Sequence, residues 1–229
     1  MIPLKDLTPR RSVPFVTLLL IAANVAVFIH QISLAPRAAD AFIQMYGLVP
    51  AKISYALAGR HYTMEQAFVP LFTCMFLHAG FLHIIGNMWF LWIFGANVED
   101  AFGAAPYLLF YIACGIVSSV TQAAFSWGSH MPSLGASGAV SGVLGAYIVL
   151  FPGSRILTLV TLFIIFFLAR VPAVIFIGLW FVVQFLSGIG SLGVASAGGV
   201  AWWAHIGGFA FGLLLTRIVR PVVPRSAYT

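Results

Sequence analysis

The sequence predicts an all-α membrane protein: a six-transmembrane-helix bundle with its N- and C-termini in the cytoplasm. Of its 229 residues, 62% are hydrophobic and only 7% are charged, whereas a soluble domain is about 25% charged. Charged residues are absent from four long stretches, 12–36, 66–98, 101–154 and 171–216. Because a helix needs about 20 apolar residues to cross a bilayer, these stretches hold five or six spans.

The first span is expected at about 13–32, directly after the basic residues Lys5, Arg10 and Arg11. A signal peptide also begins with basic residues, but its apolar core is only about 7–15 residues long. The longer run favours an uncleaved first helix. The remaining spans are expected at about 74–96, 105–125, 135–152, 171–188 and 200–218.

Three connecting segments have distinct characters. Segment 33–70 is a long polar and aromatic loop, a length that is uncommon without a function. Segment 127–134 reads as a short loop that leads into the fourth span. Segment 156–168 is apolar but lies between Arg155 and Arg170, so it is too short to span. We expect it to be an interfacial or re-entrant segment.

The basic residues set the predicted orientation, because cytoplasmic loops are enriched in Lys and Arg. Six spans place eight basic residues inside (Lys5, Arg10, Arg11, Arg155, Arg170, Arg217, Arg220, Arg225) and three outside (Arg37, Lys52, Arg60). This flanking pattern explains the net charge of +6 without nucleic acid as a partner. The predicted organisation is a cytoplasmic tail at 1–11, one membrane domain at 12–219 and a second tail at 220–229. A basic start without an organelle signal favours a bacterial plasma membrane.

Two polar residues in the charge-free stretches are the main candidates for chemistry, because polar groups in lipid are costly and often functional. Ser137 is the first and His205 is the second. A serine is a weak nucleophile until a base accepts its proton. Glycines four residues apart allow helix backbones to approach closely in lipid. Such pairs follow Ser137 and His205, and they are Gly138 with Gly142 and Gly208 with Gly212.

A second polar cluster has the composition of an oxyanion site. His83 and Asn87 are four residues apart, hence on one helical face, and both can donate hydrogen bonds. The backbone N–H of Ser137 can join them at a helix start. His78 is expected to cap or anchor the outer end of the same span. The spans contain no acid, so a Ser–His dyad is predicted; the five acids are Asp6, Asp40, Glu65, Glu99 and Asp100.

Each of these residues also has a structural interpretation. A serine among glycines can serve packing alone, and an intramembrane histidine or a His–Asn pair can hydrogen-bond between helices. Cys74 and Cys114 lie in apolar runs without CxxC spacing, which indicates two buried side chains rather than a disulfide or a metal site. No metal and no cofactor are predicted.

Taken together, the motifs resemble the rhomboid intramembrane serine proteases. They are His78-x4-His83-x3-Asn87, then Gly135-Ala136-Ser137-Gly138, then Ala204-His205-x2-Gly208-x3-Gly212. The resemblance covers about residues 12–219. It implies a six-span bundle, a Ser137–His205 dyad and an oxyanion site of His83, Asn87 and the Ser137 amide. It also implies that substrates are single-span membrane proteins cut near the outer face, commonly after a small residue.

Two features depart from the family pattern. Many members carry a Trp-Arg pair in the first long loop, whereas segment 33–70 contains no Trp. Some members stack an aromatic side chain on the histidine from the position four residues after the nucleophile, and this position is Ser141. The loop must therefore be held differently, and another contact must position the ring of His205.

Two other functions remain as alternatives. A catalytically inactive relative would bind and escort membrane helices, and the presence of both Ser137 and His205 disfavours it. A transporter or channel usually shows internal repeats or ionisable residues along its path, and neither is found here. The sequence predicts transmembrane-helix proteins and membrane lipid as partners, and it gives no oligomeric state.

Overall fold

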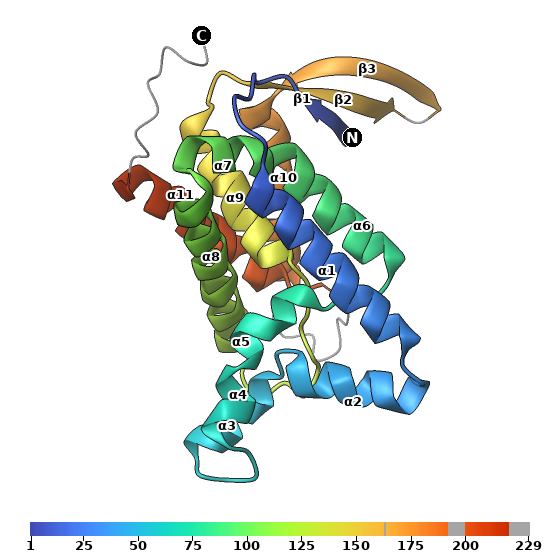
Figure 1. The fold of residues 1–229 in the computed structure, drawn as a ribbon, viewed down its shortest axis with the longest axis vertical. Helices are drawn as coiled ribbons and strands as arrows, with labels where there is room; N and C mark the ends of the chain where they lie inside the picture. The colour runs from blue at the N-terminus through green and yellow to red at the C-terminus, as the bar shows by residue number, and fades with distance from the viewer. Residues whose placement is uncertain (163, 192–199, 220–229) are drawn as a thin grey trace.

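The structure, a computed structural model, describes residues 1–162, 164–191 and 200–219. It is a bundle of helices with a small sheet at one end and a group of short helices at the other (Figure 1). The helices of the bundle are α1 (Phe15–Ser33), α6 (Phe81–Phe90), α7 (Ala96–Phe102), α8 (Ala104–Phe125), α9 (Ser137–Leu150), α10 (Ala173–Gly190) and α11 (Trp202–Val219). The predicted helical membrane bundle is confirmed. The tail predicted at 220–229 lies outside the described residues.

Within the described ranges, five helical segments are long and apolar enough to cross a membrane. One of them runs from Phe81 to Phe102 and joins α6 to α7 through a π-helical turn, η2 (Leu91–Gly95). The others are α1, α8, α10 and α11. Helix α9 has only 14 residues, or about 21 Å, against a hydrocarbon core of about 30 Å. The count of six spans and the cytoplasmic position of both termini stay predictions.

Backbone chemistry sets several helix boundaries. Gly103 adopts φ 81°, a left-handed conformation that ends α7, and its N–H donates to the carbonyl of Glu99. The side chain of Glu99 caps the start of α1, because it accepts the backbone N–H groups of Val16 and Thr17, both at 2.8 Å. These donors lack partners within α1. Glu99 is thereby a buried acid whose charge is satisfied.

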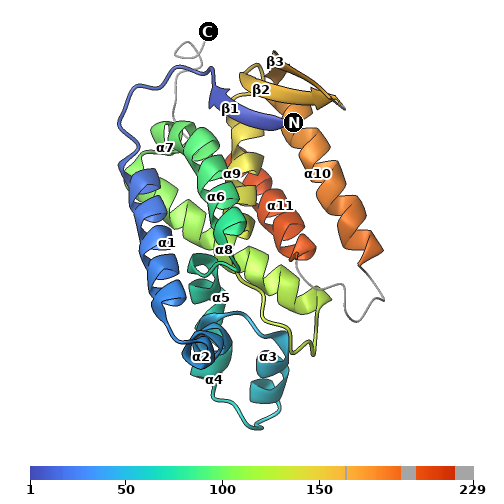
Figure 2. The ribbon, with the colours of Figure 1, turned by 90° about the vertical axis from the view of Figure 1, so that its right-hand side faces the viewer.

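Helix α9 lies inside the bundle, between α8 and α11 (Figure 2). Residues 138–147 are all buried. Glycines bring α9 and α11 together: a Cβ at Gly208 would overlap the carbonyl oxygen of Gly138, and one at Gly212 would overlap that of Gly142. Close backbone approach through small residues is a main source of helix association in lipid. It fixes α11 against α9.

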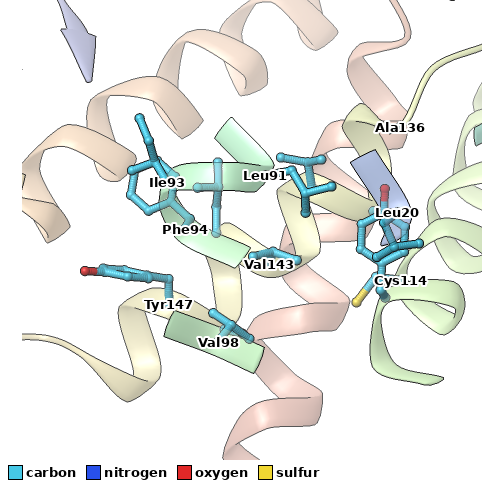
Figure 3. Packing of buried hydrophobic residues seen from close by; sticks show 14 of the residues in the cluster. Leu20, Leu91, Ile93, Phe94, Val98, Cys114, Ala136, Val143 and Tyr147 are labelled. Atoms are coloured by element: carbon cyan, nitrogen blue, oxygen red, sulfur yellow. The ribbon is translucent and has the colours of Figure 1, made fainter. Parts of the chain in front are cut away.

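Aromatic and aliphatic side chains fill the core around the second half of α9 (Figure 3). Val143 and Tyr147 are fully buried and lie beside Phe94 and Val98 of the neighbouring span. The rings of Phe94 and Tyr147 meet edge to face, with centroids 5.1 Å apart, an arrangement that aromatic pairs prefer. The core thus holds the span from Phe81 to Phe102 against α9.

A three-stranded antiparallel sheet covers one end of the bundle, in the order β1 (Ile2–Asp6), β2 (Arg155–Leu162), β3 (Ile165–Pro172). Segment 156–168 is therefore not re-entrant, because these residues form most of a β-hairpin at one end of the bundle, and its interfacial position stays a prediction. Its β-branched and aromatic residues favour strands, and the predicted N-terminal tail supplies the third strand. Tail residue Asp6 accepts hydrogen bonds from Tyr147 and Asn97 and so ties the sheet to the bundle.

The opposite end is formed by the segment predicted as a long loop, 33–70, and by the residues up to 76. The loop segment folds into α2 (Pro36–Tyr46), α3 (Pro50–Leu57) and α4 (Met64–Phe68). After it come α5 (Pro70–Thr73) and a 3-10 turn, η1 (Cys74–Phe76), where the second span was expected to begin. Proline at the first helical position starts three of these helices. Leu48 and Ser133 exchange two backbone hydrogen bonds, of 3.0 and 2.8 Å. This end is thus connected to the chain that leads into α9.

Candidate active site

Ser137 is the first residue of α9, at the end of that helix that points away from the sheet (Figure 1). The preceding Gly135 adopts φ 123°, a conformation that favours glycine. Its N–H donates to the carbonyl of Cys74 at 2.9 Å, which anchors the turn. The chain therefore enters α9 from an irregular segment, residues 132–135, that is half-buried.

The structure brings Ser137 and His205 together. The Oγ atom of Ser137 lies 2.7 Å from Nε2 of His205, although the residues are 68 positions apart. His205 comes from the first turn of α11 and is buried, whereas Ser137 is half-buried. The glycine contacts between α9 and α11 lie directly after both residues. This packing sets the distance between the hydroxyl and the imidazole.

The second ring nitrogen of His205 meets an amide rather than a carboxylate. Its Nδ1 lies 2.7 Å from Oε1 of Gln184, on α10. Two indoles flank the ring: the centroid of Trp180 is 6.0 Å away and that of Trp202 is 6.2 Å away. These contacts hold the ring of His205 in place of the stacking residue that some family members have at the position of Ser141. The hydroxyl of Ser141 instead donates to the carbonyl of Ser137 at 2.6 Å.

The predicted oxyanion donors lie beside the turn before Ser137. A Cβ on Gly135 would come within 2.7 Å of Nε2 of His83 and 3.5 Å of Nδ2 of Asn87. Nδ1 of His83 accepts the N–H of Ala79 at 3.3 Å, so a neutral ring carries its proton on Nε2. Both side chains therefore lie against Gly135, where only a residue without a side chain leaves room for the ring of His83.

His78 lies just before α6, near the end of the span that it was expected to cap or anchor. It is fully buried, and its Nε2 accepts from Nδ2 of Asn87 at 3.0 Å. Its backbone carbonyl accepts from Gln31 of α1 at 2.8 Å. The second N–H of the Asn87 amide remains for another acceptor. His78 therefore orients Asn87.

A small cavity of about 20 Å³ adjoins Ser137. Hydroxyls and an amide from α8 line it, and these side chains are Ser118, Ser119 and Gln122. A volume of about 10–15 Å³ with several polar partners is enough to hold one water molecule. The site therefore has room for water on the side of Ser137 that faces α8.

The arrangement has the parts that acyl transfer requires: a nucleophile, a base within hydrogen-bond reach and donors for a developing oxyanion. Sequence reasoning did not identify Gln184 or the cavity residues. Gln184 had a signal, because it is the one amide in the otherwise apolar α10. Cys74 and Cys114, in contrast, are buried and free as predicted.

The two departures from the family pattern have structural counterparts. Without a Trp-Arg pair, the first loop is held by Thr73, whose hydroxyl donates to the carbonyl of Tyr46 at 2.7 Å. A small apolar cluster that includes Leu48 and Ile53 packs beneath it. Trp180 and Gln184 position the ring of His205 from a different helix than the expected stacking residue.

Comparison with known proteins gives consistent matches. Residues 65–222, more than half of the chain, match the family model of the Rhomboid domain. RHOMBOID-like protein 1 of Arabidopsis thaliana is 33% identical over 153 residues, 66% of this chain and 35% of that protein. Rhomboid protein 1, mitochondrial, of Saccharomyces cerevisiae is 30% identical over 167 residues, 70% of this chain and 44% of that protein. Rhomboid protease GluP of Bacillus subtilis is 43% identical over 76 residues, 33% of this chain and 14% of that protein.

The chain spans less than half the length of these relatives. They include plant and mitochondrial proteins, so a bacterial plasma membrane stays a prediction. The apolar helices and the matched domain together identify a multi-pass membrane protein. The chain belongs to the rhomboid family.

Proposed function

We propose that this rhomboid is an intramembrane serine endopeptidase that cleaves single-span membrane proteins near the outer membrane face. The observation that carries the proposal is the 2.7 Å contact between Oγ of Ser137 and Nε2 of His205. A serine within hydrogen-bond reach of a histidine is the arrangement that activates the hydroxyl. A bacterial plasma membrane is the proposed location, with membrane lipid around the bundle.

In the proposed reaction, Oγ of Ser137 attacks the carbonyl carbon of the substrate peptide bond while its proton moves to Nε2 of His205. The carbonyl electron pair moves onto oxygen and forms an oxyanion. When this intermediate collapses, the C–N bond breaks and the amine leaves with the proton held by His205. Water then attacks the acyl ester, with His205 again as base, and releases the acid and the free serine.

Three donors suit the oxyanion: the Nε2–H of His83, the free N–H of Asn87 and the backbone N–H of Ser137. The first two flank Gly135, and the third belongs to the first residue of α9, where amides lack partners within the helix. Donors fixed before reaction stabilise the transition state without reorganisation, and removal of one costs about a hundred- to a thousandfold in rate.

The hydrolytic water has a source in the cavity beside Ser137, which is lined by Ser118 and Gln122. Bulk water is scarce in the hydrocarbon, so a protein that hydrolyses bonds there needs polar groups that retain it. This cavity is also lined by Ser137 itself, so a water molecule held there would lie next to the nucleophile.

The substrate class follows from the location of the site within an apolar bundle. A transmembrane helix hides its peptide bonds in its own hydrogen bonds. Cleavage should therefore favour segments weakened by Gly, Pro or small polar residues, which unwind more readily. Lateral access past α10 is the proposed route, because half of the residues of this helix are exposed on the bundle surface.

The test is reconstitution into lipid vesicles with a single-span substrate. We expect cleavage by the intact chain and none detectable for Ser137→Ala or His205→Ala, since loss of such a residue costs about a millionfold in a serine protease. Ser141→Ala is the matched control, a serine of the same helix that is expected to keep activity. Cleavage that survives in Ser137→Ala would end the nucleophile assignment. An intact chain that neither cleaves nor reacts with a fluorophosphonate would favour a non-catalytic protein that binds membrane helices.

A further inference from the structure

Gln184 is the one amide in α10, a helix composed otherwise almost entirely of apolar residues. Its neighbours Val183 and Phe185 are 56% and 43% exposed on the outer surface, whereas Gln184 is 8% exposed and faces inward. A polar side chain in a membrane helix is costly unless it finds a partner. The role of Gln184 therefore depends on the group that its amide contacts.

That partner is Nδ1 of His205, at 2.7 Å from Oε1 of Gln184. An amide oxygen can only accept, so the proton of the contact belongs to Nδ1 of the ring. In a neutral imidazole the other nitrogen, Nε2, then carries a lone pair. This lone pair is directed at Oγ of Ser137, 2.7 Å away. The amide thus selects the tautomer in which His205 can accept the serine proton.

We propose that Gln184 is a positioning residue that takes the place of the carboxylate of a serine triad; this proposal rests on the proposed protease function. In a triad, the third residue holds the histidine in the correct tautomer and orientation. A neutral amide does so without a charge at membrane depth, where an acid would be costly. It also stabilises an imidazolium less than a carboxylate does.

The three groups come from three helices: Ser137 from α9, His205 from α11 and Gln184 from α10. The base is therefore oriented only while α10 lies against α11. A displacement of α10 that breaks the contact with Gln184 leaves His205 free to rotate or to change tautomer. The position of α10 thus controls whether His205 has the tautomer and orientation that accept the serine proton.

The first test is the rate at which a fluorophosphonate labels Ser137, a reaction that needs an activated serine but no membrane substrate. For Gln184→Leu, which keeps the bulk and removes the acceptor, we expect labelling about 10- to 100-fold slower, the usual cost of losing a partner that orients a functional histidine. The kcat for a membrane substrate should fall by a similar factor with KM unchanged. Val183→Leu, on the outer surface of the same helix, should label at the rate of the intact chain.

Gln184→Glu separates positioning from packing. A carboxylate also accepts from Nδ1, so this variant should label within a few-fold of the intact chain. A role in packing alone predicts the opposite, because a charge buried in the bundle would disturb it. Equal labelling of Gln184→Leu and the intact chain, or a Gln184→Glu variant as slow as Gln184→Leu, would overturn the proposal.

A spectroscopic measurement is independent of catalysis. With ¹⁵N-labelled histidine rings, the His205 signals, assigned by their absence in His205→Ala, should show Nδ1 protonated and Nε2 unprotonated. Gln184→Leu should give a mixture of tautomers. An unchanged tautomer in Gln184→Leu would overturn the positioning role even in an active enzyme. An intact chain that shows the expected tautomer but does not label would instead count against the proposed protease function.

Discussion

Helix α11 carries His205, and helix α10 carries Gln184, which contacts its ring. The two helices are held in the bundle in different ways. Helix α11 meets α9 through glycines, so that the backbones touch at Gly208 and Gly212. Helix α10 is held by a few buried side chains, among them Phe176 and Ile177, and half of its residues are exposed. Helix α11 is thus fixed to α9 by backbone contacts, whereas α10 is attached to the bundle by side chains.

The two kinds of attachment suit two different requirements of the proposed active site, a constant distance between its reacting groups and a helix that can move. The distance between nucleophile and base must be constant, because rates fall steeply when reacting groups are misplaced by about 1 Å. Backbone contacts between glycines provide that constancy, since no side chain can rotate away. Under the proposed lateral access, the helix that a substrate passes needs weaker attachment, and side-chain contacts such as those of Phe176 can separate and form again.

The largest expected effect comes from separating α9 and α11. In Gly208→Val, the new side chain meets the carbonyl of Gly138 and forces the helices apart. We expect loss of detectable cleavage and a lower Tm, since overpacking typically costs about 1–3 kcal/mol. Substrate cleavage and thermal unfolding measure both. The matched control is Gly178→Val on α10, where a Cβ meets nothing within 4 Å. Equal activity of the two variants would contradict the contrast between the helices.

An intermediate effect is expected from fixing α10 to the neighbouring span. The ring centroids of Phe90 and Phe176 lie 6.2 Å apart across α6 and α10. In Phe90→Cys/Phe176→Cys, joined by a short bifunctional thiol reagent, turnover of a single-span substrate should fall at least about tenfold, a change of about 1.4 kcal/mol in activation free energy. Labelling by a small fluorophosphonate should persist.

The two single-cysteine variants, treated with the same reagent, control for the substitutions, and the native Cys74 and Cys114 are buried. Turnover of the membrane substrate at the original rate after cross-linking would refute lateral access past α10. Loss of labelling together with turnover would show that the cross-link damages the site itself.

The smallest expected effect concerns α10 alone. Gly178→Ala adds a methyl group where the structure has open space, and alanine is favoured over glycine in a helix by about 1 kcal/mol. We expect a small rise in Tm and little change in cleavage rate. A fall in Tm of several degrees would mean that α10 is packed as tightly at this position as α11 is at its glycines.

Features encoded by local spacing could be predicted from the sequence. The four-residue spacing of His83 and Asn87 placed them on one face, and the glycines after Ser137 and His205 indicated that the fourth and sixth expected spans pack closely. The charge-free stretches located the helices within a few residues, except that the expected span at 74–96 is a helix from Phe81 to Phe102.

Features that depend on tertiary contacts could not be predicted. The hairpin of β2 and β3 was missed because its apolar run also fits a membrane segment, and only its pairing with the N-terminal strand distinguishes them. Gln184 was missed although it is the one amide in α10. Its role depends on which residue of another helix it faces, and sequence spacing does not contain that information.

The indole of Trp180 gives the molecule an intrinsic optical probe. It belongs to α10, yet its ring centroid lies 6.0 Å from that of His205 on α11. Tryptophan emission shifts in wavelength and intensity with the polarity and wetness of its surroundings. Unlabelled protein therefore carries a fluorophore at the junction between its fixed and its loosely attached helix, where a passing substrate would change the emitted light.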